Sequence, residues 1–164
     1  SLCSSIAQVT GHVGGGTFAA GLLHDIGQLV MFHHCETLMI DVMEIATHRE
    51  DVTLVQAEDN VLGFNHAEVG AALALRWGLP ESIMQAIAYH HRADWPNYFL
   101  PSIAIVAYAN KIATRLNNPT YVPIRPDAPQ MQRIGEVIDV SAVDEAAMLA
   151  VARSVAEDMM LAAA

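Results

Sequence analysis

Hydrophobic residues recur along this chain at the three- and four-residue spacing of amphipathic helices, as Leu38, Val42 and Ile45 do. No stretch alternates apolar and polar residues as a β-strand would, and no heptad or internal repeat persists. The pattern therefore predicts an all-α protein, built as a globular multi-helix array and not as a coiled coil. The expected helices cover residues 1–9, 17–25, 28–34, 36–48, 53–62, 66–77, 81–91, 101–116, 131–137 and 141–164.

Short polar residues, glycine and proline mark where these helices should begin and end. Thr17, Asn65 and Ser141 stand where an N-cap side chain would accept a hydrogen bond from the first helical turn. Gly63 follows an apolar stretch in the position typical of a helix C-terminus, and Pro80 suits the opening of the next helix. These signals divide the chain into short helices, with a proline-rich surface loop expected over residues 117–129.

Several histidines fall on the apolar faces of these helices. His66 begins a stripe that continues at helical spacing to Trp77, and His90 and His91 end the stripe that Ile83 begins. A single inward histidine is usually a hydrogen-bonded core residue. Several together favour a shared site, because buried polar groups must find partners.

Two further polar residues share apolar faces. Asp25 falls on the same predicted face as Phe18 and Leu22, and Asn110 lies on the stripe of Ile103. The inward polar groups can be satisfied either by a hydrogen-bond network or by a metal ion, and spacing alone leaves both readings open.

The adjacent pair of His24 and Asp25 is the sequence's strongest sign of metal chemistry, since an imidazole and a carboxylate can both turn toward one cation. The candidate ligands of a divalent metal, for which Fe, Mn, Mg, Zn and Ni are all compatible, share nitrogen or carboxylate donors. They are His24, Asp25, His66, His90 and His91.

The composition fits one ordered domain over residues 1–164, with 53% hydrophobic and 16% charged residues. Eight basic residues against a net charge of −10 argue against binding to nucleic acid or an anionic membrane surface. No apolar run reaches the length of a membrane span, no signal peptide is recognisable, and two cysteines are too few for a disulfide framework. We therefore expect a cytoplasmic protein. The start at Ser1, inside a helical pattern, indicates that residues upstream are missing.

Four ordered motifs carry a resemblance to a known family. Residues 21–27 read GLLHDIG, residues 63–70 read GFNHAEVG and follow Glu58, residues 77–80 read WGLP, and residues 87–91 read IAYHH. In this combination, over residues 19–116, the chain resembles the HDOD domain, a bacterial signalling branch of the HD superfamily of metal-dependent phosphohydrolases. The resemblance implies an HD-type helical fold with the family's N-terminal helical portion missing.

The resemblance also implies a metal site, from which this chain departs in places. The five candidate ligands match the histidines and the His-Asp pair that hold metal in catalytic members. Asn110 stands where those members have a late Asp, and residues 1–9 hold no His. Gln28 replaces a Lys common in cyclic-dinucleotide phosphodiesterases, and no Gly-Tyr-Pro follows His91. An amide is a weaker ligand than a carboxylate for a hard cation, so the resemblance favours a degenerate site.

The sequence thus predicts a regulatory module that contacts signalling proteins or domains or binds a small nucleotide ligand. The alternative is a metal-dependent phosphohydrolase acting on a nucleotide or cyclic dinucleotide, with Asp25 as a catalytic residue. Asn110 and Arg92 are candidate ligand-binding residues, Arg92 being the obvious group to hold a phosphate. A homo-oligomer is compatible with either function.

Overall fold

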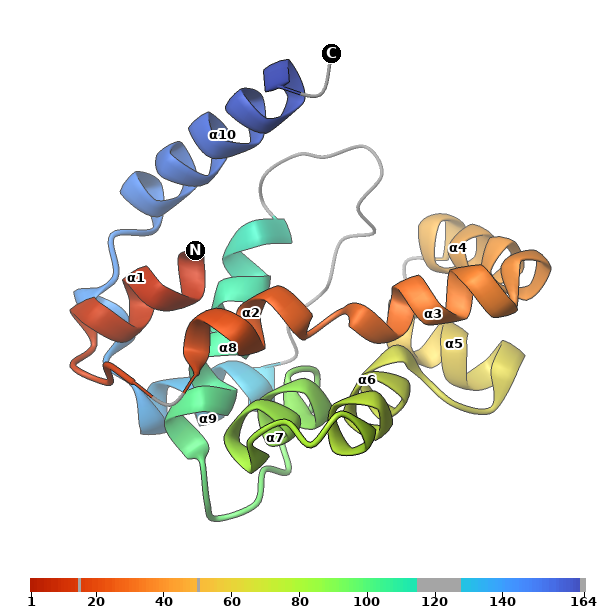
Figure 1. Cartoon of the computed structure of the whole chain (residues 1–164), viewed down its shortest axis with the longest axis horizontal. Helices are drawn as coiled ribbons and strands as arrows, with labels where there is room; N and C mark the ends of the chain where they lie inside the picture. Colours follow the sequence, from red (N-terminus) through yellow and green to blue (C-terminus); the bar gives the residue numbers. More distant parts are fainter. Residues whose placement is uncertain (15, 50, 115–127, 163–164) are drawn as a thin grey trace.

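The computed structural model describes residues 1–14, 16–49, 51–114 and 128–162, and over these it is an array of helices without a β-strand (Figure 1). The side chains are described up to residue 154. The helices are α1 (Leu2–Val9), α2 (Thr17–Leu23), α3 (Ile26–His34), α4 (Glu36–His48), α5 (Leu54–Leu62), α6 (His66–Arg76), α7 (Glu81–Tyr89), α8 (Leu100–Ala113), α9 (Ala128–Val137), a short 3-10 helix η2 (Val140–Ala142) and α10 (Glu145–Ala162). The all-α prediction is confirmed, and none of the described helices is long and apolar enough to cross a bilayer.

Local capping fixes several helix ends as the sequence predicts. Asn65 caps α6 with its side chain, while Glu68 reaches back to the Asn65 backbone N–H. Thr53 and Gln56 form the same reciprocal pair at the start of α5. That helix ends at Gly63, whose φ of 79° lies in the left-handed region that glycine tolerates.

Other predicted ends are wrong. Gly16, with φ at 75°, precedes α2, and Thr17 is the first helical residue instead of the cap. Ser141 lies in η2, and the side chain of Asp144 accepts a hydrogen bond from the first turn of α10. The helix end predicted at residue 116 lies outside the described residues, as do residues 117–127 of the predicted loop.

The predicted helix over residues 17–25 also ends early. It stops at Leu23, and α3 begins at Ile26, so the chain changes direction at His24 and Asp25. The break predicted at residues 26–27 is therefore wrong by two residues. Its actual place puts both members of the His-Asp pair in the turn between two helices.

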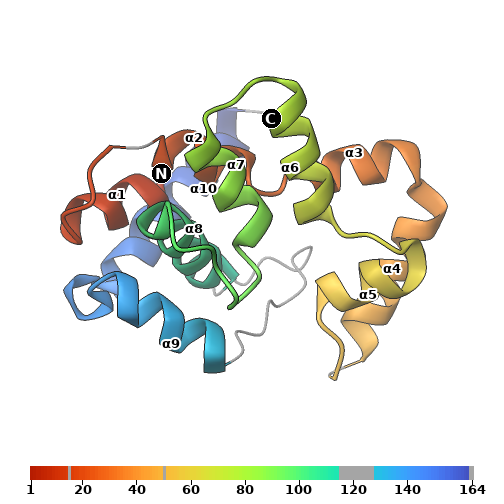
Figure 2. The same ribbon diagram turned by 90° about the horizontal axis from the view of Figure 1, so that it is seen from below.

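The main hydrophobic core surrounds α8, which contacts α1, α2, α7, α9 and α10 (Figure 2). Residues 102–110 of α8 are all buried, because this helix is apolar on every side. Ser102 and Asn110 are polar residues of this buried stretch, and Asn110 is buried as its spacing predicts.

A second, smaller core lies among α3, α4 and α5, at the right of Figure 1. Met31 of α3, Met39 and Val42 of α4, and Leu54 and Ala57 of α5 form it, and all are at most 6% exposed. Helix α6 contacts α3 on one side and α7 on the other, so it joins the two cores.

The crossing of α3 and α6 is unusually close. A Cβ atom built on Gly27 would lie 2.0 Å from the carbonyl oxygen of His66 and 2.9 Å from the backbone nitrogen of Gly70. Only glycine permits this approach, and it brings the start of α6 against the start of α3.

Two of the buried faces predicted from helical spacing are wrong, at Asp25 and at Trp77. Phe18 and Leu22 are 58% and 71% exposed, because the small residue Ala20 and not the large apolar ones faces the core from α2. The spacing does not continue through the turn at His24 and Asp25, so Asp25 shares no buried stripe with them. Trp77 follows the last residue of α6 and is 53% exposed.

Candidate metal centre

Four of the five candidate ligands converge where three helix ends meet. Asp25 precedes α3, His66 begins α6, and His90 and His91 directly follow α7. Each offers one donor atom, and these four atoms all lie within 4.8 Å of one another. Segments far apart in the sequence thus supply one carboxylate and three imidazoles to a single point.

The shortest contacts in this group join donor atoms that repel one another when unprotonated. Nε2 of His66 lies 3.0 Å from Nε2 of His91 and 3.4 Å from Nε2 of His90. Oδ1 of Asp25 lies 3.4 Å from the Nε2 atoms of both His66 and His90. Lone pairs packed this closely need a proton or a cation among them.

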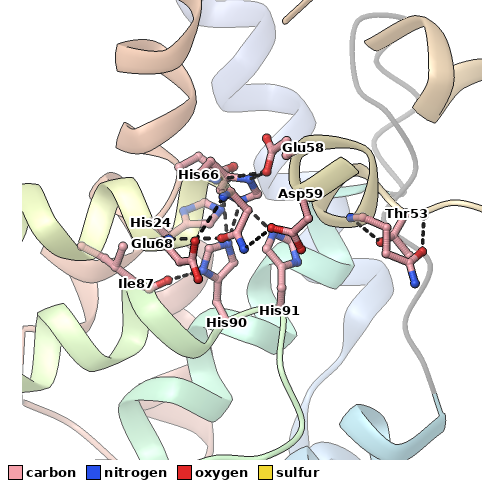
Figure 3. A network of polar contacts seen from close by, with 12 residues as sticks. His24, Thr53, Glu58, Asp59, His66, Glu68, Ile87, His90 and His91 are labelled. Carbon is pink, nitrogen blue, oxygen red and sulfur yellow. Dashed lines mark hydrogen bonds and ion pairs between the residues drawn. The ribbon is translucent and has the colours of Figure 1, made fainter. Parts of the chain in front are cut away.

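Hydrogen bonds on the far edges of the rings fix how the histidines face this point (Figure 3). Nδ1 of His90 donates to the Ile87 carbonyl at 2.7 Å, and Nδ1 of His24 donates to the Gly21 carbonyl at 2.9 Å. A carbonyl oxygen only accepts, so each Nδ1 carries a hydrogen and each Nε2 can present its lone pair. Metal-binding histidines are oriented in this way.

Glu58 performs the same task for His66. One of its oxygens, Oε2, accepts hydrogen bonds from Nδ1 of His66 at 2.6 Å and from the His66 backbone N–H at 3.0 Å. Both side chains are fully buried. The other oxygen, Oε1, is buried without a hydrogen-bond partner.

His24 borders the centre and is not part of the four-atom group. Its Nε2 lies 3.1 Å from Oδ2 of Asp25, and its ring meets that of His90 edge-on with centroids 5.1 Å apart. Nε2 of His24 and Oδ1 of Asp25 are buried without a partner in hydrogen-bonding geometry. They are the atoms a cation would be expected to satisfy.

Among the three imidazoles of the four-atom group, the pKa of one is raised and the pKa values of two are lowered. Burial lowers the pKa of His66, but hydrogen bonds and charges from Asp25 and Glu58 outweigh it and raise the pKa to about 9. Burial lowers the pKa of His90 to about 4, and burial together with His90 holds the pKa of His91 well below its usual range. Two neutral imidazoles are therefore available as ligands at neutral pH.

Asp25 is the anionic member. Burial raises the pKa of its carboxyl, but the close imidazoles of His24, His66 and His90 outweigh burial and hold the pKa well below its usual range. Asp25 is thus a carboxylate across the physiological pH range.

The two candidate ligand-binding residues lie in different surroundings. Asn110 is buried and lines a cavity of about 180 Å³ together with His24 and Gly21. Arg92 is exposed, and its guanidinium is held by the Asp94 carboxylate at 2.5 and 2.8 Å. The guanidinium also lies 5.4 Å from the centre of the Tyr89 ring.

Glu58 precedes the GFNHAEVG motif, and its role at the centre was not predicted from the sequence. A signal for it exists, because Leu54, Ala57 and Glu58 share one helical face on which the other two residues are apolar. An acidic residue on such a face must find a partner, and that partner is His66. His33, His34 and His48 are exposed.

A helical array with a His-Asp pair and three further histidines at one centre defines a protein of the HD type. The HDOD domain family model matches residues 1–93, and the chain belongs to this family.

Two similar proteins are longer than the part that this chain matches. It is 35% identical over 106 residues to an uncharacterized protein of Treponema pallidum (strain Nichols), covering 63% of this chain and 20% of that protein. A crystal structure of an HDOD domain protein of unknown function from Geobacter sulfurreducens superposes with a TM-score of 0.72 at 29% identity, over 98% of this chain and 57% of that one. The chain thus spans one fifth of the first relative and little more than half of the second.

Proposed function

We propose that this HDOD domain is a metal-binding regulatory module of a bacterial, cytoplasmic signalling protein. One divalent transition-metal ion would be held by Asp25, His66, His90 and His91. The domain would act by contacting a signalling partner or a small ligand, without hydrolysing phosphate. The observation that carries the proposal is the convergence of four donor atoms within 4.8 Å, with the rings of His66 and His90 turned toward the centre by bonds at Nδ1.

The donor set fits such an ion. Three imidazoles and one carboxylate suit Zn²⁺, Fe²⁺ or Ni²⁺ better than Mg²⁺, which prefers oxygen ligands. The buried, unpartnered Oδ1 of Asp25 points to the same conclusion, since a cation would satisfy it. When bound, the ion would supply positive charge to which an anionic group of a ligand can bind.

The pairing of Arg92 argues against hydrolysis. Phosphoryl transfer needs cationic groups on the phosphate oxygens, and the guanidinium of Arg92 is already paired with Asp94 on the surface. Asn110, where the resemblance expects a carboxylate, lines the cavity beside His24 and contributes no anionic ligand.

Metal binding is the first test. Protein purified without chelator is assayed for metal, stripped, and titrated calorimetrically with Zn²⁺, Ni²⁺, Fe²⁺, Mn²⁺ and Mg²⁺. We expect one ion per chain, with the transition metals bound far more tightly than Mg²⁺. Asp25→Asn and His90→Ala should each weaken binding at least tenfold, whereas exposed His33→Ala should not. A wild-type protein that binds none of these ions contradicts the proposal.

A phosphate-release assay separates the proposal from the hydrolase alternative. The loaded protein is incubated with nucleotides and cyclic dinucleotides in the presence of Mn²⁺ or Mg²⁺, and we expect no turnover. Metal-dependent turnover that disappears in Asp25→Ala would instead establish a phosphohydrolase.

A further inference from the structure

Glu58 connects the candidate metal centre to the smaller of the two cores. It lies on α5, one residue after Ala57, which is fully buried in the cluster formed by α3, α4 and α5. Its carboxylate reaches out of that cluster to His66, the first residue of α6. The α4–α5 hairpin (residues 36–62) is thereby hydrogen-bonded to a residue of the metal centre.

The burial of Glu58 depends on His66. A carboxylate without any exposure is costly unless it is well partnered, and the hydrogen bonds found for Glu58 come from the ring and backbone N–H groups of His66. Its second oxygen, Oε1, has no hydrogen bond to offset that cost. Helix α5 therefore carries a buried carboxylate that is stabilised by hydrogen bonds from one residue, His66.

An ion at the centre would act on the opposite edge of that imidazole. Nε2 of His66 faces His90, His91 and Asp25, whereas Nδ1 faces Glu58. A cation bound at one ring nitrogen polarises the N–H at the other, which strengthens its hydrogen bond to a carboxylate. The charge of the ion is thus felt by Glu58 across a single ring.

We propose that Glu58 is the positioning residue through which metal occupancy is transmitted to the packing of the α4–α5 hairpin. The inference rests on the proposed metal site and names how that site would regulate a surface. With metal bound, the Glu58–His66 hydrogen bond holds α5 against α6. Without metal, a proton on Nε2 of His66 supplies one positive charge in place of the ion's two, so the attraction on Glu58 falls and the hairpin opens more often. By linkage, the packing of the hairpin raises the affinity for the ion.

Hydrogen–deuterium exchange with and without saturating Zn²⁺ tests the coupling. In the wild type, Zn²⁺ should slow amide exchange in α5 by about tenfold or more, with little change in α9, which carries no ligand. Because Asp25 also links the centre to α3, slowing in α3 alone is not evidence for the route through Glu58.

Glu58→Gln isolates that route, since it keeps the shape of the side chain and removes its charge. We expect ~10–100-fold weaker Zn²⁺ binding and, at saturating Zn²⁺, no metal-dependent slowing in α5, while the segment of α7 before His90 still responds. Leu54→Ala is the matched control. It removes a buried apolar side chain of the same helix, which cannot hydrogen-bond to His66, so it should loosen α5 with and without Zn²⁺ and leave the metal response in place.

The outcomes separate the two proposals. No Zn²⁺ binding by the wild type overturns the proposed function and this inference together. Zn²⁺ binding with unchanged exchange in α5 overturns the inference alone, as does an unchanged metal response in Glu58→Gln. If Glu58→Gln does not fold, the wild type still tests the inference, because Zn²⁺ must slow amide exchange in α5 and leave exchange in α9 nearly unchanged.

Discussion

The close crossing of α3 and α6 makes Gly27→Ala the sharpest test of how the fold builds the centre. A methyl group there would lie 2.0 Å from the His66 carbonyl oxygen, and contacts under 3.0 Å essentially never occur. The helices must therefore move apart by at least about 1 Å. The obstacle is backbone, which cannot rotate away as a flexible side chain would.

Two effects of opposite sign compete in this substitution. Alanine is favoured over glycine in a helix by about 1 kcal/mol. Overpacking costs roughly 1–3 kcal/mol and sometimes more, and a backbone clash belongs at the upper end. We expect the clash to win and Gly27→Ala to lower the free energy of unfolding by about 2 kcal/mol or more. That loss corresponds to roughly 4–8 °C in the melting temperature of a chain of this size.

The assay is urea unfolding followed by circular dichroism, with Gly135→Ala as the matched control. Gly135 lies inside α9, and a Cβ atom there meets nothing within 4 Å, so that variant should gain up to about 1 kcal/mol. Gly27→Ala should also weaken Zn²⁺ binding, because it moves His66 away from Asp25. A Gly27→Ala protein within 0.5 kcal/mol of the wild type would refute the reasoning.

Three further predictions concern pH, metal and the last helix. In chelated protein, the pKa of His66 is raised to about 9, so its contribution to stability is complete below pH 6.5 and is lost as the pH rises toward 9. The pKa of His90 is lowered to about 4, so the folded protein loses stability as the pH falls below 6.5. Urea midpoints should therefore peak near pH 6.5, and a steady rise to pH 9 would contradict this. Zn²⁺ at 100 times its Kd should raise the free energy of unfolding by about 2.7 kcal/mol, reversibly with EDTA, whereas an unchanged melting curve would argue against a native-state site. Tyr108→Phe removes a 2.6 Å hydrogen bond to Glu145 that ties α10 to α8, so it should cost about 1 kcal/mol in thermal unfolding and leave the Zn²⁺ affinity unchanged.

The helices and some of their ends were predictable because their causes are local, although the caps predicted at Thr17 and Ser141 are wrong. The Asn65 cap and the glycine at the end of α5 act within a few residues of the chain, and the structure confirms both. The error at His24 and Asp25 has a longer-range cause. A helical stripe cannot be extrapolated through a turn, and the chain turns at the very residues whose orientation the stripe was used to predict.

The inward placement of His66 and His90 was predictable, whereas the arrangement of the candidate site was not. Helical spacing shows that His66 and His90 face inward, but the 3.4 Å between their Nε2 atoms depends on how α6 and α7 pack. The role of Glu58 needed the tertiary structure as well, since nothing local pairs residues on α5 and α6 across a turn. His24 is the neighbour of Asp25 in the chain but lies outside the four-atom group, and this too depends on the direction of the turn.

The burial of α8 on every side bears on where the unit of folding ends. The family model matches residues 1–93, whereas α8 covers residues 100–113 and forms the centre of the main core. A polypeptide cut after the matched segment would leave α1, α2 and α7 without the apolar surface they pack on. Experiments on an isolated piece of this protein therefore need to reach beyond α8, because the boundary recognised in the sequence lies inside the cooperative structure.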